Sequence, residues 1–127
     1  MKHMSGNMIS RWTDFLISDG EKAERNRDEE FIDRNLSKIE VIKFWEKGWN
    51  TVFDTLKRLN EDDLMKTVRI RAEPHTVVES INRQLTHYAY HVGQIVFLSK
   101  HIKGKHWQTL SIPKGKSEDF NRTKFWK

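Results

Sequence analysis

The sequence contains no cysteine among its 127 residues. The chain therefore cannot form a disulfide, bind a metal through a thiolate, or use a thiol of its own as a nucleophile. Any metal that it binds must be held by histidine, carboxylate or water. The sequence also lacks a signal-peptide pattern and any apolar run of about 18 residues, which a membrane span requires. We therefore expect a cytoplasmic protein with no membrane association.

Long blocks of one charge are also missing, although the formal net charge is +5. The 23 lysines and arginines are interleaved with 18 acidic residues along the chain. Nucleic-acid binding domains cluster their basic residues on one face or in one run, so this pattern does not favour a nucleic-acid partner. A positive surface raises the local concentration of small anions, which makes an anionic small-molecule substrate compatible with the composition.

Apolar residues recur every three or four positions in three segments of the chain. This spacing predicts an all-α fold, an up-down helix bundle with three long helices. A chain of this length supports one domain, because two separate cores would bury too little surface. The predicted domain covers residues 1–127, with helices over about 3–18, 37–59 and 75–103 and an extended C-terminal tail over 104–127 that lies against the bundle.

Several helix ends carry recognisable signals. Ser37 with Glu40 three residues later predicts a capping box at the start of the second helix. The third helix is expected to begin near Pro74 or His75, because proline suits a first helical turn. Gly104 is expected to end that helix.

The connections between the helices differ in character. Residues 21–34 are strongly charged, have no period and contain almost no apolar residue before Phe31, so we expect a solvated loop. Residues 67–71 alternate Val68 and Ile70 with charged neighbours. This alternation predicts a short edge strand or one arm of a hairpin.

Two histidines have the spacing of metal ligands on a helix. His87 and His91 are four residues apart, which places their side chains about 40° apart on one helix face. Both imidazoles can then reach one ion, although two core histidines that hydrogen-bond within the protein would show the same spacing. Arg83 and Gln94 lie four residues before and three after the pair. They are candidates for supporting the imidazoles or contacting a substrate, or they are ordinary polar residues at the helix margin.

A third ligand has to come from another part of the chain. His75 and His101 are excluded, because along one helix each lies at least 10 residues, or about 15 Å, from either member of the pair. The remaining imidazoles are His3, on the first turn of the first predicted helix, and His106, which follows the helix stop. The residues by themselves leave both open.

The string His-Tyr-Ala-Tyr-His-Val-Gly-Gln-Ile at residues 87–95, with His3 opening a Met- and Trp-containing helix, resembles the DinB and YfiT superfamily of metalloenzymes. The tail Leu-Ser-Ile-Pro-Lys-Gly-Lys at residues 110–116 is similar to a subgroup of unknown function. The resemblance implies a four-helix bundle in which three histidines from two helices hold a divalent metal. Carried over to this chain, the ligands are His3, His87 and His91, with zinc as the first expectation and nickel as the second.

The resemblance also implies a class of reaction. Some proteins of that superfamily are thiol S-transferases that use a low-molecular-weight thiol, and others are mycothiol-dependent isomerases. For this chain we therefore expect a metal-dependent enzyme, similar to a thiol S-transferase with an anionic low-molecular-weight thiol cosubstrate. The alternative is a non-catalytic helical interaction protein, or a structural metal protein with a degenerate site. A pocket beside the metal position would distinguish the two, because a structural site is closed.

The resemblance further predicts an oligomer. The chain begins where the second helix of the similar proteins would lie, so the resemblance implies that it lacks the first bundle helix. Three long helices leave apolar faces open, and we expect a homodimer to cover them. In 100° steps His3 lies almost opposite the centre of the stripe formed by Met8, Trp12 and Phe15. The sequence therefore leaves open which side of this helix faces a metal.

Overall fold

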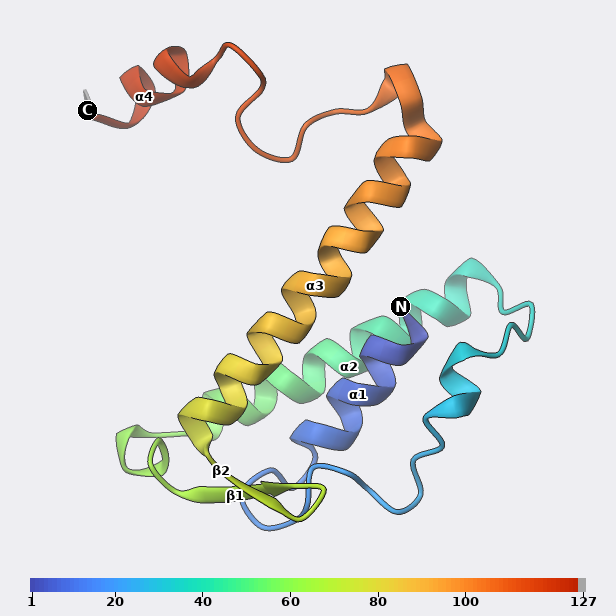
Figure 1. The fold of residues 1–127 in the computed structure, drawn as a ribbon, viewed down its shortest axis with the longest axis vertical. Coiled ribbons are helices and arrows are strands. Elements are labelled where there is room, and N and C mark those ends of the chain that lie inside the picture. Colours follow the sequence, from blue (N-terminus) through green and yellow to red (C-terminus); the bar gives the residue numbers. More distant parts are fainter. Residues whose placement is uncertain (126–127) are drawn as a thin grey trace. The chain divides into compact units, whose positions relative to one another are not determined.

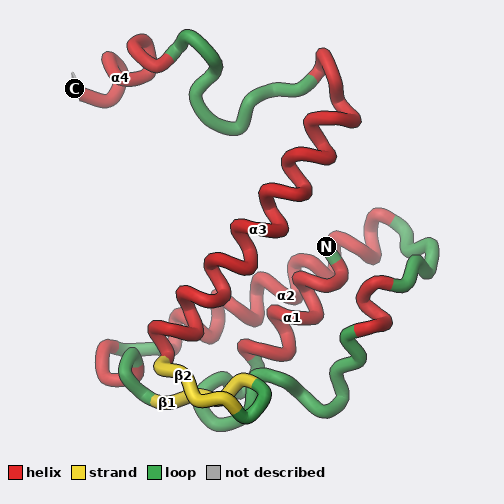
Figure 2. The backbone as a smooth tube through the Cα atoms, viewed as in Figure 1, coloured by secondary structure: helices red, strands yellow, loops and turns green. Residues whose placement is uncertain are grey.

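The computed structural model describes residues 1–125 and is mostly helical, with one small two-stranded sheet (Figures 1 and 2). The chain divides into two compact units, Met1–His91 and the part from Val92 onward, and helix α3 belongs to both. The single domain predicted over residues 1–127 stays a prediction. The longer elements are α1 (Lys2–Trp12), α2 (Lys38–Arg58), β1 (Thr67–Ile70), β2 (Glu73–Thr76), α3 (Val77–Lys103) and α4 (Ser117–Phe125), and the short 3-10 helices are η1 (Asp28–Phe31), η2 (Glu61–Asp63) and η3 (Gly104–His106).

Helix α1 is the centre of the first unit, and every one of its residues is buried or half-buried. It lies along α2 (Figure 1). The two backbones approach most closely at Gly48 of α2, where a Cβ atom would lie 2.9 Å from Met8 Sδ and 3.1 Å from Ser5 Cα. Glycine at this position therefore permits the crossing of the two helices.

The hydrophobic core of the first unit forms where α1 meets α2, the hairpin and the first half of α3. Its buried residues are Met4, Met8, Trp12, Phe15, Val52, Val68, Val77 and Tyr88, with Trp45, Trp49, Leu59 and Ile81 packed against them. Aromatic rings supply much of the contact, since Trp12 stacks on Phe15 at 4.7 Å and Trp49 lies 5.2 Å from Tyr88 between ring centroids. The core is therefore small and rich in aromatic side chains.

Strands β1 and β2 form an antiparallel hairpin, which confirms the predicted hairpin arm at residues 67–71. The two turn residues, Arg71 and Ala72, have positive φ values of 56° and 63°. Glycine or asparagine usually occupies both positions of such a turn, because other side chains are strained there. Asp19 compensates, since its carboxylate accepts the backbone N–H groups of Arg71 at 2.8 Å and of Ala72 at 2.7 Å.

The first helix is shorter than predicted. We expected it to reach residue 18, but α1 ends at Trp12 and Asp14 adopts a left-handed conformation with a φ of 49°. Phe15 is nevertheless buried, because the turn folds it back onto Trp12. The apolar spacing therefore predicted the burial of Phe15 correctly, although the backbone at Phe15 is not helical.

The second helix confirms its prediction, since Ser37 and Glu40 form the capping box in front of α2. The third helix begins at Val77 rather than near Pro74 or His75. Those two residues lie in β2, an edge strand on which proline is tolerated.

A capping box in front of α3 was missed. Thr76 Oγ1 accepts the backbone N–H of Glu79 at 3.1 Å, and Glu79 accepts the backbone N–H of Thr76 at 2.7 Å. This capping box is a local start signal two residues after Pro74, and it marks the observed start of α3.

The predicted solvated loop at residues 21–34 is only partly solvated. It contains η1, which packs against α1, and the side chains of Arg25 and Glu30 are only 6% and 9% exposed. Charged side chains can be buried when they pair, and Arg25 donates to Glu30 from Nε at 2.8 Å and from Nη2 at 2.9 Å. The sequence pattern shows the charges but not this pairing.

In the second unit α3 ends at Lys103, and Gly104 follows with a φ of 50°, which confirms the predicted stop. The prediction of an extended tail over 104–127 was wrong in part, because η3 and α4 lie within it. The charges of α4 favour a helix, with acidic residues in its first turn and basic residues in its last. Trp126, at the end of the predicted tail, lies outside the described residues. No helix within residues 1–125 is both long and apolar enough to cross a membrane.

Replacing Asp19 by asparagine should destabilise the first unit. The amide turns an N–H group toward one of the turn amides, so we expect a loss of about 1–2 kcal/mol in the free energy of unfolding at pH 7. The backbone N–H groups of Ala72 and then Glu21 hold the pKa of Asp19 below its usual value. Its contribution is therefore present above the unfolded pKa of about 3.9 and is lost as the pH falls through the lower folded pKa. Urea unfolding followed by tryptophan fluorescence at pH 7 and at pH 3 measures both effects.

Asp54 provides the control, because it is an exposed aspartate on α2 whose carboxylate lies 3.7 Å from Lys57. Asp54→Asn should change the free energy of unfolding by less than about 0.5 kcal/mol. Equal effects of the two substitutions would contradict the role given to Asp19.

Candidate metal centre

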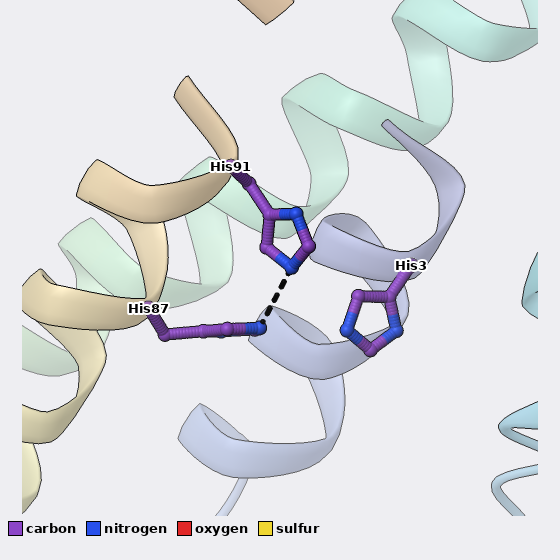
Figure 3. A group of neighbouring side chains, drawn as sticks. All are labelled: His3, His87 and His91. Carbon is purple, nitrogen blue, oxygen red and sulfur yellow. Dashed lines mark hydrogen bonds between the residues drawn. The ribbon is translucent and has the colours of Figure 1, made fainter. Parts of the chain in front are cut away.

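Three histidines from two helices come together in the first unit. His3 lies on the first turn of α1, and His87 and His91 lie on successive turns of α3 with their rings directed toward it (Figure 3). The ring centroids are 5.4 Å apart for His3 and His87, 5.3 Å for His3 and His91, and 4.7 Å for His87 and His91. The structure therefore unites the residues that the sequence separates by more than 80 positions.

The geometry of this cluster fits a divalent ion. One nitrogen from each ring lies within 4.8 Å of the other two, and the Nε2 atoms of His87 and His91 are 3.1 Å apart. Two imidazole nitrogens bound tetrahedrally to zinc at about 2.0–2.1 Å lie about 3.3 Å from each other. The spacing of the His87 and His91 nitrogens is therefore close to that of two zinc ligands.

Glu30 orients the first histidine of the cluster. Its carboxylate lies 2.7 Å from Nδ1 of His3, which places the Nδ1–H on the carboxylate side and leaves Nε2 as the lone-pair nitrogen. Phe31 stacks on the same ring with a centroid distance of 4.8 Å. A carboxylate behind a ligating imidazole fixes its tautomer and raises its basicity, which is the usual arrangement in histidine metal sites.

Gly6 makes room for that carboxylate. A Cβ atom at this position of α1 would overlap Glu30 Oε1 and would lie 2.7 Å from Glu30 Cδ. Glycine costs stability inside a helix, so its presence one turn after His3 has a structural reason. It lets Glu30 reach the imidazole from the side of the helix.

Gln84 and Asn7 occupy the corresponding position behind His87. The side-chain amide of Gln84 lies 3.2 Å from Nδ1 of His87 and donates to Asn7 Oδ1 at 2.9 Å. Both amides are buried, and together they join α1 to α3. A half-turn of an amide exchanges its oxygen and nitrogen, so this pair can also accept the Nδ1–H of His87.

Burial favours the neutral form of two of the three imidazoles. It lowers the pKa of His87 to about 4, and the neighbouring His91 and His3 act in the same direction. Burial also lowers the pKa of His3, although Glu30 opposes the shift. Neutral imidazoles present lone pairs at neutral pH, which is the protonation state that metal binding requires.

A pocket opens beside the histidines. It has a volume of about 420 Å³, and His3 and His87 form part of its wall. Tyr90 also lines it and is largely exposed, whereas Tyr88 belongs to the core. A ligand in the pocket would therefore have direct access to the two imidazoles.

The other residues predicted for the site lie at different places in the structure. Arg83 lines the pocket, and its Nη1 lies 3.4 Å from Nε2 of His75. Gln94 is exposed and belongs to the second unit, so its role stays a prediction. His106 follows α3 in η3 and is not among the clustered histidines of the described residues. The structure brings His3 to the pair, whereas the alternative of His106, which belongs to the second unit, stays a prediction.

Sequence reasoning missed the residues behind the imidazoles. Gln84 lies three residues before His87, so the helix period could have identified it. Asn7 and Arg11 follow His3 at intervals of four, which is also a helical stripe. Glu30 has no such signal, because it belongs to an irregular segment and reaches His3 only through the tertiary fold.

Replacing Gly6 by alanine should destabilise the protein, although alanine is the better helix former. The added methyl group must displace the Glu30 carboxylate, and we expect the free energy of unfolding to fall by about 1–3 kcal/mol. Gly93 of α3 is the matched control, because a Cβ atom there meets no atom of the described residues within 4 Å. Gly93→Ala should raise the free energy of unfolding by about 0.5–1 kcal/mol. Thermal or urea unfolding measures the free energy of unfolding of both variants. A Gly6→Ala variant that is more stable than the native protein would contradict the packing of Glu30 against Gly6.

Comparisons with known proteins give one result. Residues 1–116 match a family described as "Protein of unknown function (DUF1572)". Searches of curated proteins and of solved structures find no match to the chain. The match spans most of the sequence, including all three clustered histidines. The chain belongs to this family of unknown function, DUF1572.

Proposed function

We propose that the protein is a divalent-metal-dependent enzyme in which His3, His87 and His91 are the metal ligands. The observation that carries this proposal is the convergence of three imidazoles, with their ligand nitrogens within 4.8 Å of one another. Zinc is the first candidate and nickel the second, because neutral imidazole suits both ions.

An open coordination position favours catalysis over a structural role. Structural zinc sites have four protein ligands, whereas catalytic sites have three and keep one position for water or substrate. Within the described residues the cluster has three histidines, and the pocket lies against two of them. A bound ion would supply Lewis acidity to a water or thiol in that position.

The reaction class rests on the similarity to DinB and YfiT proteins. We propose a thiol S-transferase-like reaction with an anionic low-molecular-weight thiol as cosubstrate. The chain has no cysteine, so the thiol would come from the substrate. Glu30 and Gln84 hold the imidazoles in place, and the exposed ring of Tyr90 lies in the pocket where a substrate would bind.

Substitution of either paired histidine should abolish stoichiometric zinc binding. In His87→Ala and in His91→Ala two imidazoles remain, which is too few to hold zinc against water and buffer. We expect one zinc per chain in the native protein and close to none in both variants, measured by elemental mass spectrometry after dialysis. One zinc per chain in both variants would refute the proposed ligands. The experiment uses zinc as the probe metal. Copper and nickel are avoided because a free Met1-Lys2-His3 terminus would bind either ion in a square-planar site.

Two further variants separate ligands from supporting residues. His101→Ala removes an exposed imidazole of α3 outside the cluster and should retain one zinc per chain. Glu30→Gln keeps the shape of the side chain but weakens its hold on His3, so we expect unchanged stoichiometry with a roughly 10–100-fold lower zinc affinity. An unchanged affinity would remove Glu30 from the site.

We also propose that the protein acts as a homodimer. Large apolar side chains are exposed on α2 and α3, among them Ile39, Phe53, Leu85, Phe97 and Leu98. Exposed apolar surface of this extent is usual at protein interfaces, and a second copy of the chain is the simplest partner. Native mass spectrometry should give twice the chain mass of 15.2 kDa. A monomer at micromolar concentration would contradict the dimer without affecting the metal site.

A further inference from the structure

The pocket beside the histidines is strongly basic. Arginines from four parts of the first unit line it, namely Arg11 of α1, Arg25 and Arg27 of the segment 21–34, Arg71 of the hairpin turn and Arg83 of α3. No aspartate or glutamate of the described residues is among the residues that line it. The chain therefore brings guanidinium groups together from distant positions into one cavity.

The carboxylates around the pocket do not balance these charges. Arg11, Arg25 and Arg71 share one carboxylate, Glu21, with N–O distances of 3.8, 3.3 and 3.3 Å. Arg25 is held further by Glu30, so it is engaged within the protein. Among the described residues, Glu21 has the only carboxylate within 4 Å of the guanidinium groups of Arg11 and Arg71, which leaves an excess of positive charge at this wall of the pocket.

Arg83 adds to that excess. Its nearest carboxylate is Glu73, at 4.0 Å, and its side chain is 48% exposed. Arg71 is exposed to a similar degree, whereas Arg11 is only 11% exposed. A ligand entering the pocket would meet two accessible guanidinium groups first and the buried one further in.

Two buried polar atoms in the pocket wall have no hydrogen-bond partner among the described residues. They are Nη1 of Arg11 and Oγ of Ser80, and Ser80 is only 4% exposed. Buried polar groups are normally hydrogen-bonded, so unpaired ones call for a ligand or water. Burial lowers the pKa of Arg11 to about 10, and Arg83, Arg25 and Arg71 act in the same direction, so an added anion would be stabilising.

We propose that this pocket is an oxyanion subsite in which Arg11, Arg71 and Arg83 hold a phosphate or carboxylate group of a small molecule. Guanidinium groups bind both anions through paired, charge-assisted hydrogen bonds. The role of this small molecule as the substrate rests on the proposed metal centre, whereas binding of the anion does not require the metal. The anionic end would lie among the arginines and the reacting end beside His3 and His87, which share the same pocket.

The shape of the site favours a small molecule over a polymer. A pocket of about 420 Å³ has the size of a metabolite site. The arginines are positioned by rigid elements, and Arg71 is held in a left-handed turn conformation with a φ of 56°. Strained backbone of this kind often marks a functional position.

Titration of metal-free protein with inorganic phosphate and, separately, with succinate tests the subsite. Isothermal calorimetry at constant ionic strength should show saturable binding of at least one anion at one site per chain. Arg71→Gln and Arg83→Gln should each weaken that binding about tenfold or more, because each removes a charge-assisted contact. Both side chains are about half exposed, so both variants should fold, which thermal unfolding verifies.

Arg34→Gln is the matched control. Arg34 is an exposed arginine that pairs with Glu29 and does not line the pocket, so its loss changes the net charge equally. Binding should be unchanged in this variant. Equal weakening in all three variants, or no saturable binding of either anion, would overturn the subsite. Tighter binding of a single-stranded oligonucleotide that is lost in the same two pocket variants would also overturn it in favour of a nucleic acid.

The two proposals can fail separately. Anion binding without stoichiometric zinc would leave the subsite standing and remove the metal centre. Zinc binding without anion binding would remove the subsite alone. Preference for phosphate or for succinate in the native protein would name the anionic group of the substrate.

Discussion

The core and the histidine cluster both depend on one short helix, α1, which packs against the rest of the first unit through an apolar face and through a polar stripe. Met4, Met8 and Trp12 form an apolar face that packs into the core with α2. His3, Asn7 and Arg11 follow one another at intervals of four and form a polar stripe. This stripe meets α3 through the Asn7–Gln84 hydrogen bond and the histidine cluster, and it supplies one wall of the pocket. Burying polar side chains costs free energy unless they have polar partners. Here the partners are Glu30 for His3, Gln84 for Asn7 and Glu21 for Arg11.

Glu30 connects the two halves of that site. One carboxylate contacts Nδ1 of His3 and holds Arg25 through two hydrogen bonds. The negative charge is thus placed behind the imidazole and beside a buried guanidinium, and not within the pocket. Gly6 permits this position, because any larger side chain would displace the carboxylate. The histidine cluster and the arginine pocket are therefore supported by the same irregular segment of the chain.

The hairpin makes a similar contribution. Its turn uses Arg71 and Ala72 in a conformation that favours glycine, and Asp19 offsets the strain by accepting both turn amides. The pocket gains an arginine from a fixed backbone, which loses less entropy on binding than one from a mobile loop.

Several features were determined by the sequence alone, because they depend on residues close together in the chain. The capping box at Ser37, the helix stop at Gly104 and the placement of His87 and His91 on one helix face all follow from local spacing. The same spacing misplaced the end of α1, because burial of Phe15 by a turn has the same period as burial by a helix.

The rest was decided by tertiary structure, because it depends on contacts between distant residues. His3 meets His87 across 84 positions, and Glu30 reaches His3 across 27. Helical periodicity and loop composition carry no information about contacts between residues so far apart in the sequence. The sequence therefore determined that two imidazoles share a face, whereas only the fold decided which third imidazole, which carboxylate and which arginines surround them.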